Sequence, residues 1–141
     1  MKPCGTTAGA GVFICILCLS CDFFKPAQMR IKIQRTAEDY IFMLSTCSGG
    51  DIGVRGIRVT KVNDNGKLSD SDLCSFQTTM SEPIRKLWRY GSVPPNATMN
   101  ACSPLEQGSY EVHASGGEDG GYRYFQIEKD GAVKSGRGSC D

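Results

Sequence analysis

The chain has little of what most enzymes and nucleic-acid-binding proteins require. Its positive and negative charges nearly cancel, with 16 Lys and Arg against 15 Asp and Glu. Residues 1–20 contribute only Lys2 to that count, so the remainder is neutral and carries no net field that would attract nucleic acid. Long Leu/Ala-rich helical patterns are also missing, whereas 17 glycines are present, which favours an all-β fold.

Catalytic and metal-binding motifs are equally scarce. The one histidine, His113, lies in SYEVHAS, where the alternation turns it outward beside Glu111. No G-x-S-x-G elbow or cysteine–histidine pairing accompanies it. The segment NDNGKLSDSD lacks the spacing of an EF-hand loop, and no C-x-x-C pair follows residue 21. We therefore expect no enzyme activity, no metal and no cofactor.

The first twenty residues have the pattern of a secretory signal peptide. Their apolar run extends from Val12 to Leu19. This run is far shorter than the roughly 20 residues of a membrane-spanning helix, but it matches a signal-peptide h-region of about 7–15 residues. Because no amphipathic periodicity is visible, we favour export over the alternative of a buried N-terminal strand or helix.

The end of this stretch, Cys18-Leu19-Ser20-Cys21, resembles the lipobox of bacterial lipoproteins. The resemblance implies that Cys21 is lipidated, that residues 21–27 are a tether, and that the protein is anchored at the periplasmic face of a bacterial membrane. It departs from the family pattern at Cys18, where leucine is usual. The alternative is a plain secretory signal, which would give a secreted, disulfide-bonded protein without lipid.

Eight cysteines are present, and four of them lie beyond the leader and Cys21. An even, widely spaced set in an exported chain predicts two disulfides. We favour Cys47–Cys74 with Cys102–Cys140, because each pair closes a loop of about 30–40 residues, for which loop entropy gives about 3–4 kcal/mol. The nested alternative, which contains Cys47–Cys140, stays open.

Residues 28–141 are expected to form one β-rich domain. Alternation and short apolar runs predict strands at 28–35, 39–47, 53–62, 73–78, 84–90, 109–114 and 122–128. Asn65-Gly66 and Asp130-Gly131 predict tight hairpins, and the segments 79–83 and 91–108 are expected to be irregular. Seven or eight short antiparallel strands indicate a small β-sandwich or barrel.

Two segments carry residue types that are enriched at protein interfaces. They are IRKLWRYG and ASGGEDGGYRYF, and the candidate partner contacts are Arg85, Trp88, Arg89, Glu118, Asp119 and Tyr122. The first segment has an alternative interpretation, in which Trp88 and Tyr90 belong to the core and only the basic residues are solvated. The second is alternatively an ordinary flexible hairpin.

The pattern C-x-P-L-x-x-G-x-Y-x-V, from Cys102 to Val112, resembles small periplasmic lipoproteins that act as type VI secretion immunity proteins. This resemblance implies a protein that binds and neutralises a toxin without a cofactor, and we expect the protein to be a monomer. The chain is also similar to the lipoprotein lysozyme inhibitors in size, in β content and in a cysteine near the C-terminus, and ASGGEDGGY loosely matches their Ser-Gly-x-x-Tyr loop. A passive structural envelope lipoprotein is the remaining alternative to these binding roles.

Overall fold

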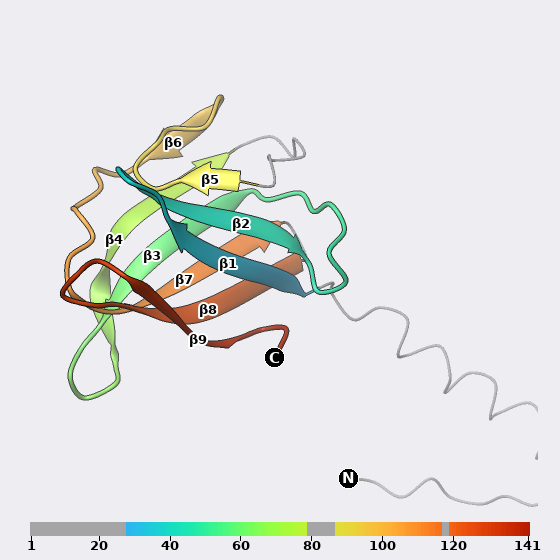
Figure 1. Ribbon diagram of the computed structural model, residues 1–141. Helices are drawn as coiled ribbons and strands as arrows, with labels where there is room; N and C mark the ends of the chain where they lie inside the picture. The colour runs from blue at the N-terminus through green and yellow to red at the C-terminus, as the bar shows by residue number, and fades with distance from the viewer. Residues whose placement is uncertain (1–27, 79–86, 117–118) are drawn as a thin grey trace, which may run out of the picture.

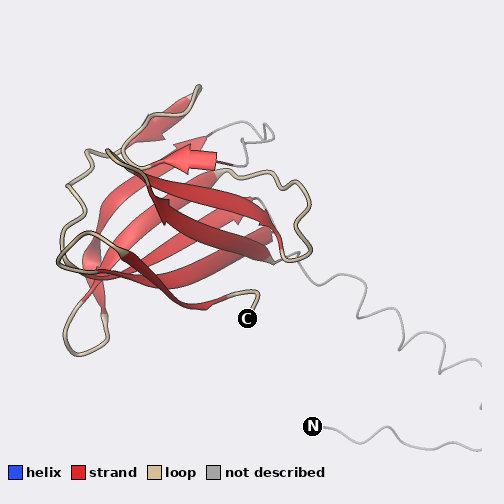
Figure 2. Cartoon of the chain, viewed as in Figure 1, coloured by secondary structure: helices blue, strands red, loops and turns tan. Residues whose placement is uncertain are grey.

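The computed structural model describes residues 28–78, 87–116 and 119–141. This part of the chain contains nine strands and no helix (Figures 1 and 2). The strands are β1 Met29–Arg35, β2 Tyr40–Thr46, β3 Gly56–Val62, β4 Leu68–Thr78, β5 Leu87–Arg89, β6 Ala97–Met99, β7 Gly108–Gly116, β8 Asp119–Ile127 and β9 Val133–Gly138. The predicted leader, the Cys21 lipidation site, the tether, Arg85 and Glu118 lie outside the described residues.

The strands form two antiparallel sheets that pack together as a sandwich, which confirms the predicted all-β class. The small sheet has the order β1-β2-β5, and the large sheet has the order β6-β4-β3-β7-β8-β9. Strand β1 lies alongside β8 and β9, so one edge of the small sheet approaches one edge of the large sheet (Figure 1). Among the described residues, no helix is long and apolar enough to cross a membrane.

The core lies between the two sheets and follows the predicted alternation. On β1, Met29 and Ile31 are fully buried, while Lys32 is exposed. On β7, the buried residues Val112 and Ala114 alternate with more accessible neighbours in the same way. Because successive side chains of a strand point to opposite faces, each sheet presents one apolar face to the core and one polar face outward.

Both predicted hairpins are confirmed. Gly66 has a φ of 77°, and its amide donates to the carbonyl of Asn63 at 2.8 Å. Gly131, with a φ of 82°, forms the corresponding bond to Glu128 at 2.9 Å. Glycine tolerates this left-handed conformation because it has no Cβ, so the Asn-Gly and Asp-Gly pairs identify the turns correctly.

The structure has more strand than the sequence predicts. Strand β6 falls inside the segment 91–108, which was expected to be irregular, and β4 begins at Leu68 instead of residue 73. Three residues of β6 pair with β4, with Thr98 opposite Gln77. A strand this short has too few residues to show a period-2 pattern, so it is determined by the open edge of β4.

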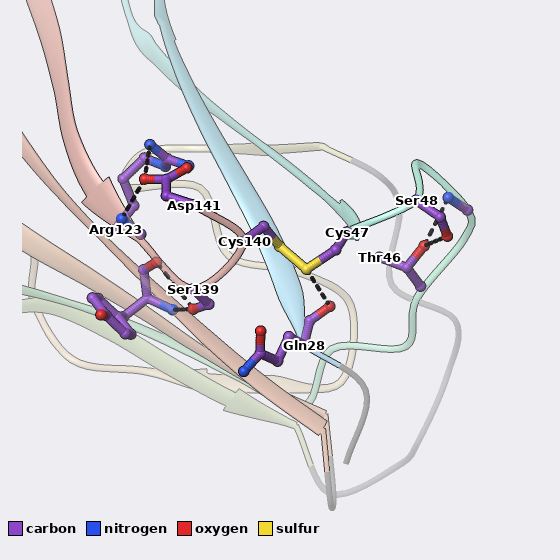
Figure 3. Close-up of a disulfide and its surroundings, with 11 residues drawn as sticks. Gln28, Thr46, Cys47, Ser48, Arg123, Ser139, Cys140 and Asp141 are labelled. Atoms are coloured by element: carbon purple, nitrogen blue, oxygen red, sulfur yellow. Dashed lines mark hydrogen bonds and ion pairs between the residues drawn. A yellow bond between two sulfur atoms is a disulfide. The ribbon is translucent and has the colours of Figure 1, made fainter. Parts of the chain in front are cut away.

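The favoured disulfide connectivity is wrong, and the nested alternative is correct. Cys47 is joined to Cys140, with Cα atoms 5.5 Å apart, and Cys74 to Cys102, with Cα atoms 4.3 Å apart. The physical reason is the unpredicted strand β6, which carries the chain back along β4 and so brings Cys102 to Cys74. Figure 3 shows the other disulfide at the end of β2, beside Gln28, where the described chain begins.

Candidate functional site

Trp88 was a candidate partner contact, but it is a core residue. Its side chain is 3% exposed and contacts the rings of Phe42 and Phe76 at centroid distances of 5.2 and 5.3 Å. Its indole N–H donates to the carbonyl of Ser92 at 2.9 Å, so its one polar group is satisfied internally. The structure therefore agrees with the alternative interpretation, in which the aromatic residues of this segment pack inward.

Arg89 is exposed at the edge of the small sheet, whereas Asp119 and Tyr122 lie on β8 of the large sheet. Its guanidinium lies 3.5 Å from the carboxylate of Asp39, and both side chains are accessible to solvent. A surface ion pair of this kind contributes about 0–1 kcal/mol to stability. The four candidate contacts that the structure describes, Trp88, Arg89, Asp119 and Tyr122, therefore do not form a single surface.

The glycine-rich hairpin between β7 and β8 has a packing role. A Cβ at Gly121 would collide with the backbone carbonyl of Met29, and a Cβ at Gly116 would collide with that of Gly53. Gly116 pairs with Asp119 across the hairpin, and residues 117–118 between them lie outside the described residues. Gly116 and Gly121 are therefore required because other backbone segments pack closely against them, independently of any binding role of the hairpin.

Tyr122 belongs to a larger surface on the side of the large sheet that faces away from the core, which we call the outer face. Its members are Arg58 on β3, Glu111 and His113 on β7, Tyr122 and Tyr124 on β8, and Arg137 on β9. The register sets them in two rows: Arg58, His113 and Tyr122 lie directly across from one another, and Glu111 lies opposite Tyr124. Neighbouring strands are about 4.8 Å apart, so each row is continuous at side-chain dimensions.

Tyrosine rings and charged groups interact directly on this face. The rings of Tyr122 and Tyr124 meet edge to face at 5.8 Å, and the guanidinium of Arg137 lies 5.9 Å from the centre of the Tyr124 ring. A hydrogen bond to the carboxylate of Glu111 is the main reason that the pKa of the Tyr124 hydroxyl is raised. These contacts hold two large amphipathic side chains in place at the surface, where they remain accessible.

A hollow of about 420 Å³ adjoins the first row, and we call it the Arg58 hollow. Its polar lining includes Arg58, Asp72, Ser75, Gln77, Thr98, Asn100, His113 and Ser115, from β3, β4, β6 and β7 and from the residue just after β6. Asp72 reaches this face because of a bulge in β4, where the register shifts between Val59 opposite Cys74 and Thr60 opposite Asp72. The extra residue, Leu73, lets Cys74 point inward while Asp72 points outward.

His113 lies between Arg58 and Tyr122 and is partly buried. Desolvation is the main reason that its pKa is lowered, and the neighbouring Arg58 guanidinium lowers it further, while Glu111 acts in the opposite direction. The imidazole is therefore neutral at pH 7 and both donates and accepts one hydrogen bond. Among the described residues, no group of three or more His, Cys, Asp or Glu side chains is placed to hold a metal ion.

Sequence reasoning identified Tyr122 and the outward direction of His113 and Glu111, but it missed Arg58, Tyr124 and Arg137 as members of one surface. The alternation in GIRVTKV already places Arg58 on the solvent side of its strand. What the sequence does not contain is the strand order, in which β3 lies beside β7 and β4 lies between β3 and β6. Comparisons of the chain with protein-family models, curated proteins and solved structures find no match.

Proposed function

We propose that the protein is an exported cell-envelope lipoprotein, anchored through Cys21, that binds a protein partner through its outer face. The observation that carries the binding role is the cluster of tyrosine and arginine side chains on that face. Tyr, Trp and Arg dominate the energetics of protein interfaces, because they bring large contact areas together with hydrogen-bonding groups. The cluster lies within four adjacent strands, β3, β7, β8 and β9, of a disulfide-bonded sandwich, which provides a rigid platform.

Export is supported by the two disulfides. Disulfides persist in oxidising compartments such as the bacterial periplasm and are rare in the cytosol. Both join segments that are far apart in sequence, with separations of 93 and 28 residues. In this proposal, the signal-peptide pattern of residues 1–20 directs export, and the lipobox pattern that ends at Cys21 provides the membrane anchor.

The anchor would also orient the outer face. Gln28 begins the described chain beside the Cys47–Cys140 disulfide (Figure 3). Residues 21–27 would form a tether of at most about 25 Å, since an extended chain spans about 3.5 Å per residue. The sandwich would therefore stand near the membrane surface, joined to its tether at Gln28, which lines a hollow together with Tyr122 and Arg137 of the outer face. The specific role that we propose is neutralisation of a toxin or of an envelope enzyme.

The binding role is tested by purifying the full protein from envelopes of its source cells, with Tyr124→Ala, Arg137→Ala and Lys32→Ala variants in parallel. Lys32 is exposed on β1 of the small sheet, so its variant is the control for a surface change away from the outer face. We expect one partner to co-purify with the wild type and the Lys32 variant, and to be depleted at least tenfold from the other two. Equal recovery with all four proteins would exclude the outer face as the binding surface.

The anchor is tested by metabolic labelling with a fatty-acid analogue. Wild-type protein should incorporate the label, and a Cys21→Ser variant should not, because the thiol is the attachment point. The substitution leaves every residue of the described strands unchanged, so the variant should retain the melting temperature of the wild type. Label on the Cys21→Ser protein, or none on the wild type, would overturn the lipoprotein assignment.

A further inference from the structure

Arg58 is the central positive charge of the large sheet. It is exposed on β3, and its two cross-strand neighbours are Ser75 on β4 and His113 on β7, neither of which carries a negative charge at pH 7. Among the residues that the structure describes, Arg58 forms no ion pair. Three cations among the described residues are paired: Arg89 with Asp39 at 3.5 Å, Arg123 with Asp141 at 3.1 Å (Figure 3) and Lys134 with Glu128 at 2.5 Å.

The groups around Arg58 add hydrogen-bond donors to this charge. The side-chain amide of Asn100 donates to the hydroxyl oxygen of Ser75 at 3.0 Å. Ser75 thereby accepts one bond and keeps its own hydroxyl proton for a further acceptor. The neutral imidazole of His113 also has one N–H to donate. A guanidinium flanked by a hydroxyl and an imidazole is suited to a carboxylate, which accepts from a guanidinium in a bidentate fashion.

We propose that the Arg58 hollow receives a glutamate or aspartate side chain of the protein partner. This inference rests on the proposed function and specifies the partner's chemistry at one point of the outer face. The carboxylate pairs with Arg58 and accepts from Ser75 and His113. The hollow is open and shallow on a sheet surface, so it suits a side chain that projects from a larger binding partner.

Asp72 decides between kinds of anion. Its carboxylate borders the same hollow and accepts a hydrogen bond from the hydroxyl of Thr60 at 3.2 Å. Because the Asp72 carboxylate lies near the Arg58 guanidinium, the hollow can accommodate a ligand with a single negative charge but disfavours the double charge of a phosphate. Proteins bind phosphate groups with clusters of arginines. A peptide also carries backbone N–H groups, which can donate hydrogen bonds to the carboxylate of Asp72. An acidic residue within a polypeptide therefore offers a partner to both Arg58 and Asp72.

The unique histidine makes the hollow directly observable. His113 is the only histidine of the chain, so one imidazole signal in an NMR spectrum of the exported protein in detergent micelles reports the hollow. The probe is glutamate blocked at both termini by acetyl and amide groups, and blocked glutamine is the neutral control. We expect the blocked glutamate to shift the His113 signal saturably, with a Kd on the order of 1–10 mM, and to raise the pKa of His113.

Charge variants define the expected pattern. Arg58→Gln should weaken the blocked glutamate at least tenfold, whereas Lys32→Gln, which removes a charge from the small sheet, should leave binding unchanged. Asp72→Asn should strengthen binding about two- to threefold, because it removes a nearby negative charge and keeps an acceptor for Thr60. The indole N–H signal of Trp88, the only tryptophan and a core residue, verifies that each variant is folded.

Three results of the binding titrations would overturn the inference. These are the absence of a saturable shift with the wild type, equal binding by the wild type and Arg58→Gln, and inorganic phosphate binding more than tenfold tighter than the blocked glutamate. The last result would assign the hollow to phosphorylated ligands. If Tyr124→Ala removes the partner and Arg58→Gln does not, the inference fails while the proposed function stands. If the wild type retains no partner, the proposed function fails.

Discussion

The two faces of the large sheet come from the same strands but are organised by different forces, as two tyrosines show. Tyr110 on β7 points into the core, where it is 2% exposed and stacks on Phe125 at 5.4 Å. Its hydroxyl donates to the carbonyl of Glu106 at 2.9 Å and accepts from the amide of the same residue at 3.2 Å. Tyr124, on the neighbouring strand β8, points outward and bonds to the side chain of Glu111.

The difference shows which surface is available for function. The core face satisfies all the polar groups of Tyr110 from the backbone, so nothing is left to offer a partner. The outer face holds its aromatic rings through contacts with Glu111 and Arg137, and one side of each contact stays open to solvent. Changes on the core face should therefore lower the free energy of unfolding, while changes on the outer face should alter binding.

Removing the disulfide that joins the end of β2 to the residues after β9 should lower the free energy of unfolding most. A Cys47→Ala/Cys140→Ala double variant loses a crosslink of 93 residues, for which loop entropy gives about 4–5 kcal/mol. The pair Cys74→Ala/Cys102→Ala loses a loop of 28 residues and should cost about 3–4 kcal/mol. Urea denaturation of both variants measures the difference. Thiol labelling of the unreduced, unfolded wild type should find no free thiol among these four cysteines. Two or more labelled cysteines would contradict the presence of both disulfides.

Truncation on the core face should come next. Phe125 is 2% exposed and contacts the rings of Phe42 and Tyr110. A Phe125→Ala variant loses this packing and leaves a cavity, so the free energy of unfolding should fall by about 3–5 kcal/mol. Chemical denaturation provides the value. Tyr122→Ala on the outer face of the same strand is the matched control, and a cost above about 1 kcal/mol there would contradict the distinction between the faces.

Removing a single hydroxyl group from each face should show a smaller difference in stability between the faces. Tyr110→Phe removes the part-buried hydrogen bonds that the hydroxyl forms with the amide and carbonyl of Glu106 and should cost about 1 kcal/mol. Tyr124→Phe removes a bond at the surface, where water replaces it, so the cost should stay within about 0.5 kcal/mol. Thermal denaturation of the two variants decides the matter. Equal costs would mean that the Tyr124–Glu111 contact supports the fold as well as the surface.

The smallest expected effect is the pH dependence contributed by His113. Burial and Arg58 on β3 hold its pKa below 6.5 in the folded protein, against the weaker effect of Glu111 on its own strand, and Tyr122 faces it from β8. Below pH 6.5 the unfolded chain therefore binds a proton that the folded chain does not, so stability falls as the pH is lowered through this window and is unaffected above it. His113→Asn should reduce this slope. An NMR titration that gives a pKa above 6.5 would contradict it.

Local sequence determined β1 and the two tight hairpins of this protein. Period-2 alternation in QMRIKIQR predicted β1, and the Asn-Gly and Asp-Gly pairs predicted the β3–β4 and β8–β9 hairpins, because both signals arise from the backbone conformation of a few consecutive residues. The same alternation identified the outward direction of His113. These features need no information from distant parts of the chain.

Only the tertiary structure decided the disulfide pairing, the burial of Trp88 and the composition of the outer face. Cys102 reaches Cys74 because β6 adds to the free edge of β4, and Arg58 meets His113 because β3 pairs with β7 across about fifty residues of chain. The β4 bulge then turns Asp72 to the outer face. Strand order and register depend on which faces can be buried together, and that choice is made by packing between residues far apart in sequence.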